Sequence, residues 1–127
     1  MKELRIYEPL YQADITYLTD CTIYEVIELL KQRHVDVQPW SWSEQFQWGG
    51  DAHTTDGYQF HINAPYGNGE MFYVWMNKVT PSLLFHETFH LVGDILHTRG
   101  IVYCSSSEEA FAYLGGWIFQ EVHTLML

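Results

Sequence analysis

The sequence His86-Glu87-Thr88-Phe89-His90 constrains this chain more than any other feature. Apolar residues around it recur at helical spacing, and histidines four positions apart lie on one face of a helix, where both imidazoles can reach a single metal ion. Zinc binds such nitrogens at about 2.0–2.1 Å in a tetrahedral arrangement. Glu87 follows the first histidine directly, which is the position of a general base for zinc-activated water. The pattern therefore predicts a zinc site with His86 and His90 as ligands and Glu87 as the catalytic residue.

Two helices are predicted in this half of the chain. The first begins at Thr80-Pro81, with threonine as N-cap and proline at the first helical position, and Gly100 ends it. The second follows the serines at 105–107, and its apolar residues are Phe111, Leu114, Ile118 and Val122. A short turn between them predicts that the second helix folds back antiparallel to the first.

A catalytic zinc ion normally has a third protein ligand and keeps its fourth position for water. His97 is a poor candidate, because it lies eleven residues beyond His86, about 16 Å along a helix. Glu108 and Glu109 open the next helix and are better placed. Ser105 and Glu108 fit a capping box, which leaves Glu109 free to face the histidines.

The HExxH sequence followed by Glu109-Ala110-Phe111-Ala112 resembles the gluzincin pattern of thermolysin-like zinc peptidases. The resemblance implies His86, His90 and Glu109 as ligands and Glu87 as the base. It also implies that Asp94 could orient an imidazole from outside the ligand set. The same part of the chain, through "EEAFAYLGGW", resembles small HExxH proteins of tailed phages and prophages, many of unknown role.

Some positions depart from the gluzincin pattern. Tyr113 stands where gluzincins often place an aspartate, and from a length of 127 residues we expect no second domain that would close a substrate cleft. Tyr103, Tyr113 and His97 are candidate donors to a developing oxyanion, each with a structural role as the alternative. The resemblance further implies that the strand Phe72–Asn77 is the sheet edge beside the metal helix, where an extended peptide could pair.

The remaining patterns predict an α+β fold with a small antiparallel or mixed sheet. Alternation predicts a strand at 13–18, and a capping box at Thr22 and Glu25 opens a helix over 22–34. The segment 58–77 reads as an antiparallel hairpin. The aromatic segment 39–50 has period two and is either a strand or an extended loop.

Composition narrows the class of protein. A length of 127 residues fits one zincin-like domain over 1–127. The net charge of −10, with 16 acids and 6 bases, argues against nucleic-acid binding. The N-terminus lacks a signal-peptide pattern and no apolar run reaches the roughly 20 residues that span a bilayer, so we expect a cytoplasmic protein with no membrane contact. Cys21 and Cys104 are expected to be free, buried thiols.

The sequence thus predicts a minimal gluzincin-like zinc metallopeptidase that acts on a peptide or protein substrate. Two alternatives stay open. In the first, the protein is a non-catalytic accessory or interaction module in which zinc, or the remnant of a zinc site, only joins helices. In the second, it is a metal-dependent hydrolase whose substrate is not a peptide.

Overall fold

The computed structural model describes residues 1–33, 56–63 and 69–127. These residues form the strands β1 (Lys2–Glu8), β2 (Ala13–Thr19), β3 (Gly57–Asn63) and β4 (Glu70–Met76). They also form the α-helices α1 (Ile23–Arg33), α3 (Pro81–Thr98) and α4 (Glu108–Val122), followed by the 3-10 turn η2 (His123–Met126). The aromatic segment 39–50 lies outside the described residues.

The four strands make one mixed sheet in the order β1-β2-β4-β3. β1 pairs antiparallel with β2, and β3 pairs antiparallel with β4, as predicted for the hairpin. β2 and β4 are parallel, with Ile15 opposite Phe72 and Leu18 opposite Trp75. The predicted α+β class with a small mixed sheet is confirmed.

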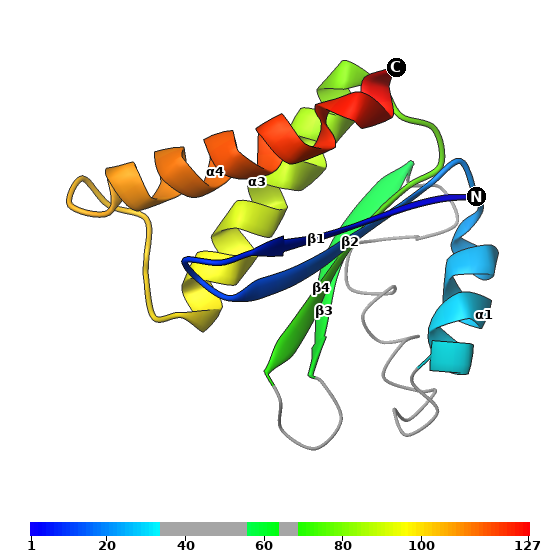
Figure 1. Ribbon diagram of the computed structural model, residues 1–127, viewed down its shortest axis with the longest axis horizontal. Coiled ribbons are helices and arrows are strands. Elements are labelled where there is room, and N and C mark those ends of the chain that lie inside the picture. The colour runs from blue at the N-terminus through cyan, green and yellow to red at the C-terminus, as the bar shows by residue number, and fades with distance from the viewer. Residues whose placement is uncertain (34–55, 64–68) are drawn as a thin grey trace.

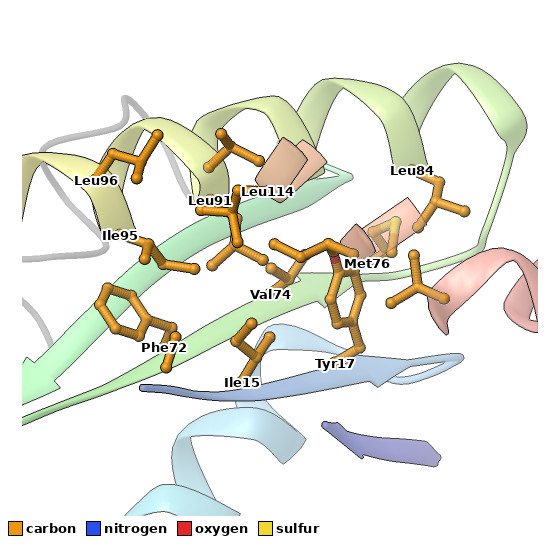
Figure 2. Close-up of a cluster of buried hydrophobic side chains, with 14 residues drawn as sticks. Ile15, Tyr17, Phe72, Val74, Met76, Leu84, Leu91, Ile95, Leu96 and Leu114 are labelled. Atoms are coloured by element: carbon orange, nitrogen blue, oxygen red, sulfur yellow. The ribbon is translucent and has the colours of Figure 1, made fainter. Parts of the chain in front are cut away.

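The sheet lies between helices on its two faces (Figure 1). Alternate side chains of β4 point to opposite faces, as the pleat requires. Phe72, Val74 and Met76 join the core formed with α3 and α4, whereas Tyr73 and Trp75 join the core formed with α1. Figure 2 shows the first of these cores, where Leu84, Leu91, Ile95 and Leu96 of α3 meet Ile15, Tyr17 and the β4 side chains. This packing fixes α3 on the sheet.

Local sequence signals explain where the helices begin and end. In the capping box of α1, the Thr22 N–H donates to Glu25 Oε1 (3.0 Å) and the Glu25 N–H to Thr22 Oγ1 (3.2 Å). Thr80 caps α3, because its Oγ1 accepts from the Leu83 N–H at 3.1 Å. Beyond α3 the chain reverses at Gly100, whose φ of +77° favours glycine.

Three expectations were wrong or incomplete. β4 is an internal strand of the sheet, so Phe72–Asn77 is not its edge; within the described residues the edge on this side is β3. The cap of α4 is Ser107 rather than Ser105, and it makes no side-chain capping bond because its hydroxyl donates to the Val102 carbonyl at 2.6 Å. The strand β1 was not anticipated.

The two cysteines are free, with Cys21 buried and Cys104 exposed, so the expectation of burial is wrong for Cys104. Hydrogen bonds with the hydroxyls of Ser106 and Ser107 lower the pKa of the Cys104 thiol to about 7. Among the described helices, none combines the length and the apolar character needed to cross a membrane.

Candidate metal site

The two histidines of α3 face each other across one helical turn. Their Nε2 atoms are 3.2 Å apart, and their ring centroids are 4.8 Å apart at an interplanar angle of 70°. His86 and His90 are both exposed, because they lie on the flank of α3 that the core does not cover. Burial and then the positive charge of His86 lower the pKa of His90, which favours a neutral imidazole with a free lone pair.

Glu87 has the opposite environment. It is buried at 6% exposure, although His86, the residue before it, is exposed. Its Oε1 is 3.9 Å from Nε2 of His86. Burial raises the pKa of the Glu87 carboxyl, and the charge of His86 only partly opposes this shift. A carboxylate of raised pKa beside two imidazoles is suited to accept and return a proton.

One glycine lets β3 approach this carboxylate closely. A Cβ atom on Gly57 would lie 3.0 Å from the Trp75 carbonyl oxygen, 3.2 Å from Cδ1 of Leu83 and 3.3 Å from Cγ of Glu87. A side chain at residue 57 would therefore displace β3 or the side chains of α3. Gly57 has no local sequence signal, and only the three-dimensional packing shows its importance.

These side chains line an open groove of about 950 Å³ between β3 and α3, which we call the α3–β3 groove. Besides Gly57 and the two histidines, it is lined by Asp56, Tyr58, Gln59, Asn77, Lys78, Thr80, Ser82, Leu83 and Glu87. Apart from the three HExxH residues, none of them was predicted as a site residue. Ser82 and Leu83 belong to α3 itself, and most of the others come from β3 and from the segment between β4 and α3, whose position beside α3 depends on tertiary structure.

The spacing of the histidine pair matches that of two nitrogen ligands of one zinc ion. Two nitrogens bound at about 2.05 Å with a tetrahedral angle lie about 3.3 Å apart, close to the 3.2 Å between the Nε2 atoms. The rotamers of His86 and His90 therefore already have the spacing of two ligands of one ion. Without a metal, the same spacing allows a hydrogen bond between one protonated and one unprotonated ring nitrogen.

A third ligand is not assembled around this pair. Within residues 1–33, 56–63 and 69–127, no three His, Cys, Asp or Glu side chains are grouped so that they could hold a metal ion. Glu109 is exposed on the first turn of α4. The rings of Phe119 and Phe85 meet with centroids 6.1 Å apart, and Glu109 precedes Phe119 by ten residues, about 15 Å of helix. The structure therefore does not bring Glu109 to the histidines, and its role as a ligand stays a prediction.

Asp94 does hold an imidazole, but that of His61 on β3. Its Oδ2 lies 2.8 Å from Nδ1 of His61 and accepts from Nε2 of Gln59 at 2.7 Å. The hydrogen bond to Asp94 raises the pKa of His61. Asp94 therefore joins α3 to the edge strand. No hydrogen bond links it to His86 or His90 within the described residues.

The three candidate oxyanion donors lie away from the histidine pair. The Tyr113 hydroxyl donates to Oε1 of the buried Glu8 at 3.2 Å, which is a structural contact. Tyr103 packs edge-on against Phe111, with ring centroids 4.8 Å apart. His97 is exposed on the last turn of α3. None of the three lines the α3–β3 groove.

Comparisons with protein-family models, with curated proteins and with solved structures find no match for this chain.

Proposed function

We propose that the protein is a zinc-dependent hydrolase that cleaves peptide bonds in the α3–β3 groove. The observation that carries the proposal is the pair of Nε2 atoms 3.2 Å apart with the buried Glu87 carboxylate beside it. Histidine pairs on helices occur without function, but a desolvated carboxylate that lines the same open groove is costly to maintain.

In this proposal His86 and His90 hold the zinc ion through Nε2. When bound, zinc would supply Lewis-acid polarisation and a water molecule of lowered pKa. The Glu87 carboxylate would act as the general base, accepting a proton from the attacking water and returning it to the leaving amine. Burial of its carboxyl keeps the Glu87 pKa raised, so the protonated form is accessible when the leaving group needs a proton.

The substrate would lie along β3. This strand pairs with β4 on one side, and within the described residues no strand covers its other side. An extended peptide that adds to an edge strand gains backbone hydrogen bonds, which do not depend on its sequence. Because Gly57 and Gln59 line the groove with Glu87, a peptide on this edge would pass close to the proposed base.

Glu109 remains our proposed third ligand. For it to reach His86 and His90, α4 would have to shift along α3 or its first turn would have to rearrange. Glu109→Ala tests the assignment directly. A zinc Kd unchanged by this substitution would exclude Glu109 and leave the third position to another group.

The catalytic claim is tested by Glu87→Gln in zinc-loaded protein. We expect this variant to keep its zinc and to lose hydrolysis of an unstructured protein substrate by at least about 100-fold, the usual minimum for a general base. Glu121→Gln, an exposed acid on α4, is the matched control and should hydrolyse at the wild-type rate. Hydrolysis undiminished in Glu87→Gln would remove Glu87 from the mechanism.

A second candidate function is a non-catalytic module in which zinc only stabilises the fold. The lack of a third ligand beside the histidines in the described residues favours it. In that case zinc would raise the Tm of wild type and of Glu87→Gln equally, and neither protein would hydrolyse any peptide. Hydrolysis by wild type that depends on Glu87 would exclude this candidate.

A further inference from the structure

The basic residues of this chain are few, and nearly all of them have an acidic partner. The chain has 6 lysines and arginines against 16 acids. Five of the six have a carboxylate oxygen within ion-pair distance: Lys2 with Asp20, Arg5 with Asp14, Lys31 with Glu28, Arg33 with Glu3 and Arg99 with Glu70. The exception is Lys78, for which the described residues offer no such carboxylate.

Lys78 lies in the groove that contains the HExxH residues. It follows β4, precedes the cap of α3 and lines the α3–β3 groove together with His86 and Glu87. None of the carboxylates that the structure describes lies within ion-pair distance of its ammonium, although the chain has a net charge of −10. Its ammonium is therefore available to a negative group that enters the groove.

We propose that Lys78 binds a carboxylate of the substrate and makes the groove selective for peptides that carry a negative charge near the reacting bond. The carboxylate is an Asp or Glu side chain or the C-terminal carboxylate of the peptide. This inference rests on the proposed function, because it assigns a substrate class to the same groove. Lys78 is a specificity-determining residue and takes no part in the chemistry.

Lys78 and Glu87 line the same groove, so a carboxylate held by Lys78 would lie in the groove with the peptide bond that Glu87 acts on.

Acidic groups of the protein limit how strong this selectivity can be. Asp56 and Glu87 line the same groove and repel an incoming carboxylate, whereas Tyr58, Gln59 and Asn77 carry no charge. Lys78 itself is exposed. An exposed ion pair of this kind changes affinity by about two- to five-fold, and added salt weakens it.

The test measures equilibrium binding of three peptides to zinc-loaded Glu87→Gln protein, in which the peptides are not consumed. The first peptide has an internal Asp and an amidated C-terminus, the second has Asn and a free C-terminal carboxylate, and the third has Asn and an amidated C-terminus. We expect the first, the second or both to bind about two- to five-fold more tightly than the third. The peptide that shows the preference identifies the source of the carboxylate.

The preference should disappear when Lys78→Met is added to this background and turn into a disadvantage with Lys78→Glu. Lys31→Met, which removes a lysine of α1 that is paired with Glu28, is the matched control and should keep the preference. Equal affinity for all three peptides, no binding of any of them, or a preference that survives Lys78→Met would overturn the proposal. The proposed function is judged separately by hydrolysis, because a Lys78-dependent preference without any cleavage by wild type would refute catalysis alone.

Discussion

The close approach of β3 to α3 gives the sharpest prediction about stability. Gly57→Ala adds a methyl group 3.0 Å from the Trp75 carbonyl oxygen, and that oxygen belongs to β4, which pairs with β3 and cannot move independently of it. Overpacking of this kind costs about 1–3 kcal/mol. Alanine regains about 0.5–1 kcal/mol, since glycine loses more backbone entropy on folding. We therefore expect Gly57→Ala to lower the free energy of unfolding by about 1–2 kcal/mol.

Gly93→Ala is the matched control, because the same added atom meets nothing within 4 Å at this position of α3. It should raise the free energy of unfolding by about 0.5–1 kcal/mol through helix propensity alone. Urea unfolding followed by tryptophan fluorescence measures both variants, and the two midpoints should move in opposite directions from wild type. A Gly57→Ala protein at least as stable as wild type would refute the argument that glycine is needed for the contact between β3 and Glu87.

Three further predictions concern stability. Leu91→Ala removes a fully buried side chain of the core and should lower the free energy of unfolding, measured in urea, by about 2–5 kcal/mol. Phe89, on the same helix, is 63% exposed, so Phe89→Ala should lower it far less. Similar losses in the two variants would contradict the packing of α3. Glu8→Gln replaces a buried carboxylate that accepts hydrogen bonds from the backbone N–H groups of Leu10 and Tyr11. It should lower the free energy of unfolding by about 1–3 kcal/mol, and an unchanged Tm would contradict this prediction. Asp94 raises the pKa of His61, so the pair of Asp94 with protonated His61 stabilises the folded protein. This stabilisation is fully present below the pKa of an unfolded histidine, about 6.5, and is lost as the pH rises through the pKa of His61 in the folded protein. The stability difference between wild type and Asp94→Asn should therefore shrink from pH 5.5 to pH 9, and a difference that grows over this range would contradict the assignment.

The sequence predicted those elements whose signals are local. The capping box at Thr22 and Glu25, the cap at Thr80 and the reversal at Gly100 all act within a few residues of the chain, and each is present. The geometry of the histidine pair is local in the same sense, because the pitch of one helix determines it. Nothing about the rest of the fold was needed to place His86 and His90 side by side.

Predictions that depended on packing between elements were less successful. β4 was assigned to the sheet edge, although its unbroken apolar run Met71–Met76 is typical of a strand that is buried on both faces. β1 has Leu4 and Ile6 on alternate positions, separated by Arg5, which is a local signal of a strand. The edge position of β3, and with it the groove, follows from the parallel pairing of β2 with β4, which no local pattern encodes.

The third ligand shows the same limit. Sequence spacing placed Glu109 at the start of the next helix, which is correct, but spacing does not determine how far one helix slides along another. That offset is set by aromatic packing, in which Phe119 of α4 meets Phe85 of α3. In this packing Phe85, Val92, Phe111 and Gly115 line one apolar cavity of about 320 Å³ between the two helices.

The central claim is that His86 and His90 bind one zinc ion, and metal content measured by mass spectrometry tests it most directly. Purified wild-type protein should contain close to one zinc per chain, and His86→Ala and His90→Ala should each lose it. His123→Ala, which removes an exposed imidazole at the C-terminal end of α4, should keep it. Metal-free wild-type protein that takes up no added zinc, or full occupancy in both histidine variants, would contradict the account.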